Sequence, residues 1–261
     1  MKLDLGNWRA TVARYQHPDV RRSVTQIFTT LVPLAVMLYL MYLSLGRSYW
    51  LTLLLAVPTA GLMVRTFIIM HDCGHGSFLP SQRLNNLVGW VTGLLTLTPY
   101  GEWTHEHAIH HATAGDLDRR GHGDIATLTV GEYLALGRWG RLKYRFYRHP
   151  LAVLLLGPVY MMVGQRIPGR HKSGGAPKNA SVWSTNLGIA IAVTALAVVI
   201  GIQSVLLVYL PTAYLAASAG VYLFFVQHQF DGAYWERHAD WDYATTAISG
   251  CSYLKLPRVL Q

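Results

Sequence analysis

Histidine is the residue type in this sequence with the most chemical potential, because six of its twelve copies fall within residues 71–111. The first cluster is His71-Asp72-Cys73-Gly74-His75, and the second is His105-Glu106-His107-Ala108-Ile109-His110-His111. Residues three and four apart lie on one helical face, so His71 and His75 form one pair, and His107, His110 and His111 form a second group. Neutral imidazole is a common metal ligand, and two such clusters together predict a metal site.

Two familiar metal motifs do not fit these clusters. The zinc-protease motif H-E-x-x-H fails because Ile109 stands four residues after His105. A carboxylate-rich di-iron bundle needs two Glu-x-x-His motifs and further glutamates, and only residues 102–105 match that pattern. The spacing does not choose the metal either, since affinity alone favours other divalent metals over iron.

Two acidic residues stand next to candidate ligands. Asp72 follows His71 and Glu106 precedes His107, so each can accept a hydrogen bond from the second ring nitrogen of a ligating histidine. We therefore take Asp72 and Glu106 as candidates for orienting the metal ligands. The alternative is that both are solvated acids or acids near a helix start.

The composition around these clusters is that of a lipid-embedded chain. Of the 261 residues 52% are hydrophobic and only 13% are charged, about half the charge of an ordinary soluble domain. This excludes a disordered chain, and two cysteines exclude a disulfide scaffold. The net charge of +9 raises the question of nucleic acid binding, but membrane proteins concentrate Lys and Arg in cytoplasmic loops, so we expect no nucleic acid partner.

The apolar runs predict an all-α integral membrane protein. Four transmembrane helices are expected at about residues 25–45, 49–70, 184–201 and 205–227, in two hairpins. The shorter charge-free stretches 84–101 and 150–165 are expected to be interfacial or partly inserted helices. Trp90, Tyr100 and Trp103 are expected to be aromatic residues of the membrane interface.

The distribution of basic residues predicts the orientation. Residues 1–22 hold five Lys and Arg and residues 71–178 hold twelve, whereas the two hairpin turns contain only Arg47. Both termini and the cytoplasmic and interfacial helices that carry the histidine clusters are therefore expected on the cytoplasmic side.

Beyond these patterns, the sequence resembles the membrane fatty acid desaturases. The resemblance rests on residues 71–78, on Trp103 ahead of residues 107–112, and on the stretches 115–121 and 225–230. It favours the bacterial acyl-lipid branch with ω-6/Δ12-type enzymes, and it covers nearly the whole chain as one desaturase domain over residues 1–261.

This resemblance implies a di-iron centre whose two iron ions are bound by His71, His75, His107, His110, His111 and His228. It further implies O2 as co-substrate, a long-chain acyl substrate linked to lipid, CoA or carrier protein, and an external ferredoxin or cytochrome b5-type electron donor. The implied location is the bacterial inner membrane.

The sequence departs from the family pattern after residue 250. The family has a third box, of the H-x-x-H-H type, after a stretch like Ser249–Tyr253, but no such box occurs before Gln261. We therefore expect a C-terminally truncated sequence that does not turn over by itself. The alternative is a natural homologue that has lost the third box.

Two other functions use the same residue types. A related membrane di-iron hydroxylase or ketolase acting on a lipid or carotenoid would yield an alcohol or ketone instead of an alkene. A histidine-lined metal transporter would place ionisable groups in mid-membrane, whereas the predicted spans hold only boundary residues such as Arg65.

Overall fold

The computed structural model describes residues 8–13, 15–121, 125–169, 176–253 and 255, which form helices and no strand. The helices are α1 (Trp8–Ala13), α2 (Val20–Ser44), α3 (Tyr49–Gly74), α4 (Gln82–Leu95), α5 (Tyr100–Thr113), α6 (Val130–Ala135), α7 (Arg138–Tyr147), α8 (Pro150–Met162), α9 (Ala176–Ile200), α10 (Ile202–His228) and α11 (Tyr243–Ser249), with a 3₁₀ turn at Gly164–Arg166. This confirms the prediction of an all-α membrane protein.

Four of these helices are long and apolar enough to cross a membrane. They are α2, α3, α10 and the part of α9 from Asn179 onward, and they form the two predicted hairpins. The observed helices begin or end a few residues outside the predicted spans. Asp19 caps the start of α2 by accepting a hydrogen bond from the Arg22 amide, and Gly201, with φ of 80°, makes the turn from α9 to α10.

Threonines on α3 pack the interior of the bundle without leaving polar atoms unpaired. Thr52, Thr59 and Thr66 are fully buried at intervals of seven residues, which places them on one side of the helix. Thr59 Oγ1 donates to the Leu55 carbonyl at 2.6 Å and Thr66 Oγ1 to the Leu62 carbonyl at 2.9 Å. Small side chains that satisfy their own hydroxyls allow α2 and α10 to approach α3 closely.

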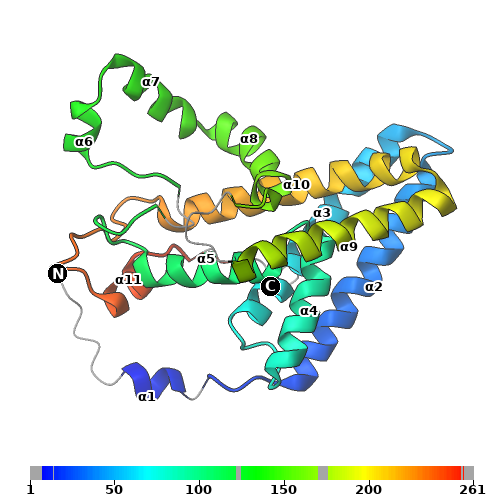
Figure 1. The fold of residues 1–261 in the computed structure, drawn as a ribbon, viewed down its shortest axis with the longest axis horizontal. Coiled ribbons are helices and arrows are strands. Elements are labelled where there is room, and N and C mark those ends of the chain that lie inside the picture. The colour runs from blue at the N-terminus through cyan, green and yellow to red at the C-terminus, as the bar shows by residue number, and fades with distance from the viewer. Residues whose placement is uncertain (1–7, 14, 122–124, 170–175, 254, 256–261) are drawn as a thin grey trace.

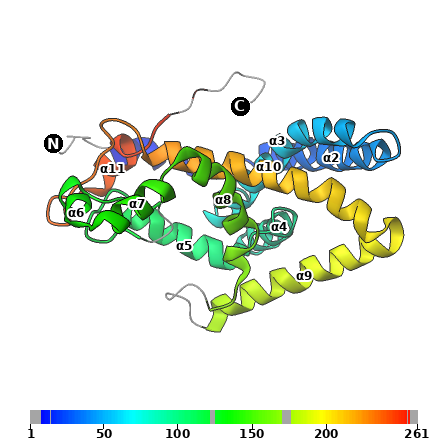
Figure 2. The same ribbon diagram turned by 90° about the horizontal axis from the view of Figure 1, so that it is seen from above.

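The two hairpin turns lie at one end of the molecule, and α5, α6, α7 and α11 lie at the opposite end (Figures 1 and 2). Helices α3 and α10 both run away from these turns, so His71 and His228, near their C-terminal ends, lie on the side of the bundle away from the turns. This arrangement agrees with the predicted separation of hairpin turns from histidine clusters.

The two shorter apolar stretches contain helices shorter than the four spans. Residues 84–101 cover most of α4, a 14-residue helix packed against α3, and a turn in which Leu97 has φ of 57°. Residues 150–165 contain α8, which packs against α10. Helix α7 and residues Pro150–Arg166 are bent by 71° relative to each other, and together they are long and apolar enough for one broken span. Helix α9 is largely exposed along its length, as expected for a lipid-facing helix; its exposed apolar side chains are Trp183, Leu187, Ile191, Leu196, Val198 and Val199.

Candidate metal centre

Four histidine side chains converge where α3 ends beside α5. His107 Nε2 lies 3.0 Å from His71 Nε2, 3.2 Å from His75 Nε2 and 3.0 Å from His111 Nε2. The ligand nitrogens of all four lie within 4.8 Å of one another. Such a group can hold a metal ion, and its members are His71, His75, His107 and His111. We call them the four-histidine group.

A close contact between α3 and α5 positions these side chains. The Tyr100 hydroxyl, at the start of α5, donates a hydrogen bond to the Cys73 carbonyl at 3.0 Å, near the end of α3. Gly74 permits this approach, since a Cβ there would meet Thr104 Oγ1 and the Trp103 ring at 3.1 Å each. The pair His71 and His75 on α3 therefore faces the pair His107 and His111 on α5.

Trp103 forms one wall of the four-histidine group. Its ring stacks on His107 with centroids 4.3 Å apart, and it packs edge-to-face with Phe67, with centroids 5.4 Å apart. Tyr100 is buried and Trp103 packs against a candidate ligand, so both pack the site, and their place at the membrane interface stays a prediction. The spacing of Trp103 and His107, four residues apart, was the available sequence signal.

Asp72 contacts a candidate ligand in the way its position in the sequence suggested. Its Oδ1 lies 3.0 Å from His71 Nδ1. An ionised carboxylate only accepts hydrogen bonds, so this contact places the proton on Nδ1 and leaves the Nε2 lone pair facing the other histidines. Glu106 is half-buried on α5, and its orienting role stays a prediction.

The local environment favours the neutral form of three of these imidazoles. Burial, followed by repulsion from His71 and the other histidines around it, lowers the pKa of His107 to about 2. Burial and neighbouring histidines lower the pKa of His111 to about 4, and burial also lowers the pKa of His75. Because a metal binds the neutral form, these three nitrogens, together with the His71 Nε2 that converges with them, are a donor set that fits a metal ion.

A second pair of histidines adjoins the first group. His110 Nε2 lies 3.1 Å from His228 Nε2, although the two residues are 118 positions apart in the sequence. His228 Nδ1 lies 3.0 Å from the Gly250 carbonyl, so this nitrogen donates and Nε2 is left as the acceptor. Phe224 lies against both rings, with centroids 5.3 Å and 5.8 Å away.

The predicted grouping on α5 is therefore only partly right. His107 and His111 join the histidines of α3, whereas His110 turns toward α10 and pairs with His228. The two groups remain neighbours, because the ring centroids of His110 lie 6.0 Å from His107 and 5.8 Å from His111.

Comparison of the sequence with known proteins identifies the family of this chain. The sequence profile of the fatty acid desaturase family matches residues 48–255. A fatty acid desaturase of Bacillus subtilis is 44% identical over 252 residues, which is 96% of this chain and 71% of that protein.

More distant relatives share parts of the chain. An sn-1 acyl-lipid omega-3 desaturase (ferredoxin) of Synechocystis is 31% identical over 197 residues, covering 70% of this chain and 52% of that protein. An endoplasmic reticulum omega-3 fatty acid desaturase of Nicotiana tabacum is 36% identical over 107 residues, covering 41% of this chain and 26% of that protein. With the matched profile, the Bacillus relative and histidines that can bind metal, the chain belongs to the fatty acid desaturase family.

Proposed function

We propose that the protein is an O2-dependent fatty acid desaturase that introduces a double bond into a long acyl chain at a histidine-bound di-iron centre. One observation carries the proposal: six histidines from α3, α5 and the end of α10 form two adjoining groups in a chain of this family. In this proposal the four-histidine group serves one iron ion, and His110 and His228 contribute to the other.

The reaction demands an oxidant that no side chain supplies. Two bound iron ions would supply the activation of O2 needed to oxidise an unactivated C–H bond. In the balanced reaction, two hydrogen atoms, each a proton with one electron, leave adjacent methylenes, two more electrons come from the donor with two protons, and O2 becomes two waters. The product keeps both carbons, joined by a double bond.

The protein's own residues hold the centre in place and exclude water. Asp72 keeps the lone pair of His71 pointed inward, and the Gly250 carbonyl does the same for His228. Trp103 stacks on His107 and Phe224 lies against both His110 and His228, and such apolar walls would limit water beside the reacting carbons. The apolar helices around the site are proposed to bind the acyl chain.

The location and partners follow from the same proposal. The helices α2, α3, α9 and α10 would cross the bacterial inner membrane, with both termini and the histidines on the cytoplasmic side, because the basic residues gather there. The Synechocystis relative's name specifies acyl-lipid and ferredoxin. We therefore favour a lipid-linked acyl substrate over CoA or carrier protein, and ferredoxin over a cytochrome b5-type donor.

The test is to express the complete reading frame that contains this sequence, with iron and a ferredoxin system, and to analyse membrane fatty acids. New unsaturated species that disappear in a His107→Ala variant are expected. An alcohol or ketone product would instead identify the related hydroxylase or ketolase chemistry. Zinc in the purified protein together with transport in vesicles would contradict the proposal.

A further inference from the structure

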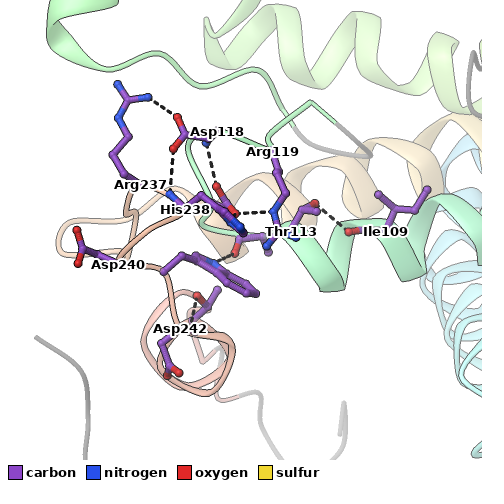
Figure 3. A network of polar contacts seen from close by, with 12 residues as sticks. Ile109, Thr113, Asp118, Arg119, Arg237, His238, Asp240 and Asp242 are labelled. Atoms are coloured by element: carbon purple, nitrogen blue, oxygen red, sulfur yellow. Dashed lines mark hydrogen bonds and ion pairs between the residues drawn. The ribbon is translucent and has the colours of Figure 1, made fainter.

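A completely buried carboxylate lies just beyond the end of α5. Asp116 is 0% exposed, and its Oδ2 accepts hydrogen bonds from Arg119 Nε at 2.6 Å and from His238 Nδ1 at 2.8 Å. Its Oδ1 accepts from the Asp118 amide at 2.9 Å. Figure 3 shows this network beside the last turn of α5, with Asp118 in turn holding Arg237. Asp116 thus joins the segment after α5 to the segment after α10.

Backbone contacts reinforce the same junction. Asp116 and Glu236 form an isolated parallel bridge, in which the Leu117 amide donates to the Glu236 carbonyl and the Glu236 amide to the Gly115 carbonyl, each at 2.9 Å. Trp241 Nε1 donates to the Ala114 carbonyl at 2.9 Å. Residues 234–241 are therefore fastened to the residues that directly follow α5.

The fastened segment continues to the histidine at the end of α10. The Tyr234 amide donates to the Ser249 carbonyl at 3.3 Å, after α11 has returned the chain toward α10. The next residue, Gly250, supplies the carbonyl that accepts from His228 Nδ1, and the Ser252 amide donates to the Gln227 carbonyl at 2.8 Å. A chain of contacts thus runs from Asp116 to His228.

The hydrogen bonds of this junction depend on the negative charge of Asp116. Burial alone raises the pKa of Asp116, but the hydrogen bonds from Arg119, His238 and the Asp118 amide outweigh it and lower the pKa. The ionised carboxylate is thus the acceptor that all three donors require. Replacing it with an amide leaves the volume nearly unchanged but turns a donor either toward Arg119 and His238 or toward the Asp118 amide.

We propose that Asp116 is a positioning residue for the second metal of the centre. By holding residues 234–250 against the end of α5, it keeps the His228 ring facing His110. Asp116 touches neither histidine, and it acts through His238, Arg119 and the Gly250 carbonyl. This inference rests on the proposed function, because the affected metal is the one that His110 and His228 would bind.

The proposal predicts a selective defect. The four-histidine group is built on α3 and α5, which contact each other without residues 234–250. Loss of the Asp116 network should therefore weaken one metal and spare the other. A purely structural role would lower the affinity for both metals together.

The experiment uses protein purified from the complete reading frame, titrated with Co²⁺ and monitored by its absorption spectrum. Asp116→Asn is the main variant, and His238→Leu removes one of its donors. His238→Asn is the conservative variant, because its amide can replace the Nδ1 donor. Glu132→Gln is the matched control: Glu132 also accepts from an arginine, Arg120, and from a backbone amide. In the described part of the chain no hydrogen bond or ion pair links it to residues 234–250, and only its charge reaches Arg237.

We expect two binding phases in the wild type, and a roughly 10-fold loss of affinity in one phase only for Asp116→Asn and His238→Leu. His238→Asn and Glu132→Gln should retain both phases. Hydrogen exchange in the metal-free protein should be faster at residues 225–230 and 243–250 of Asp116→Asn.

Equal weakening of both phases, an unchanged Asp116→Asn titration, or a Glu132→Gln result like that of Asp116→Asn would overturn the inference. Absence of Co²⁺ binding by the wild type would instead overturn the proposed function. The exchange measurement would then decide separately whether Asp116 holds the 234–250 segment.

Discussion

The four-histidine group and the pair formed by His110 and His228 are assembled in different ways. The first is made by two regular helices, α3 and α5, whose side chains lie one turn apart and face each other across a contact at Gly74. The second joins one helix position to the very end of α10, and the residues that orient His228 come from the irregular segment after it.

The histidine side chains of the two groups are therefore held in place by different kinds of structure. In the four-histidine group, helical periodicity sets the spacing within each pair, and only the crossing of two helices must be added. In the second pair, a buried carboxylate, backbone contacts and a carbonyl hydrogen bond replace the regular scaffold. We therefore expect substitutions near the first group to act on ligands directly, and those near the second to act through the loop.

The largest expected effect is that of removing the central imidazole. His107 lies within 3.2 Å of three other histidines, so His107→Ala should abolish metal binding at the four-histidine group and all desaturation. Metal content of the purified protein and membrane fatty acid analysis measure the loss. His105→Ala, two residues away on the same helix, is the control, and an equal loss there would refute the assignment.

A smaller loss is expected from Asp72→Asn, which exchanges the carboxylate acceptor beside His71 Nδ1 for an amide. The free choice of tautomer at His71 should weaken metal binding at the four-histidine group by about 10-fold or more, while leaving the other metal in place. Co²⁺ titration separates the two sites. An effect confined to the His110 and His228 pair would contradict the structure.

The second region is tested without touching a ligand by Gly115→Ala. Gly115 has φ of 74°, and a Cβ there would lie 2.9 Å from the Tyr234 carbonyl oxygen. The substitution should lower the free energy of unfolding by roughly 1–2 kcal/mol. Thermal melting in detergent measures it, with Gly131→Ala as control, since a Cβ at Gly131 meets nothing within 4 Å. Equal melting of the two variants would contradict the close contact.

The smallest effect concerns pH. The folded-state pKa values of His107 and His111 lie below the unfolded value of about 6.5, so the unfolded state binds more protons as the pH falls. Their contribution to stability is complete above pH 6.5 and is lost as the pH falls, toward pH 4 for His111 and toward pH 2 for His107. The metal-free protein should therefore melt at a temperature several degrees lower at pH 5 than at pH 7.

A His107→Leu variant sharpens this test. With one titrating group fewer, its metal-free melting temperature should depend less steeply on pH in the same window. Identical profiles for the variant and the wild type would show that His107 is not held neutral in the folded state.

Much of the architecture was accessible from the sequence. Long uncharged runs specify membrane helices because a crossing needs about 20 apolar residues whatever their order, and the four predicted spans are observed. The spacing of His71 with His75 and of His107 with His111 specifies shared helical faces for the same local reason.

What periodicity could not decide was which faces meet. His110 shares a helical face with His107 and His111, yet it turns to His228, and Trp103 stacks on His107 inside the site. Only the packing of α5 against α3 and α10 distinguishes these outcomes.

The sequence by itself determined the membrane spans, the two hairpins and the pairs of histidines within single helices, because hydrophobicity and helical periodicity act over short distances. Tertiary structure alone decided the pairing of His110 with His228 and the burial of Asp116 between Arg119 and His238. The contacts of His110 with His228 and of Asp116 with His238 join residues more than a hundred positions apart, and no local pattern in the sequence records which distant partner a side chain will face.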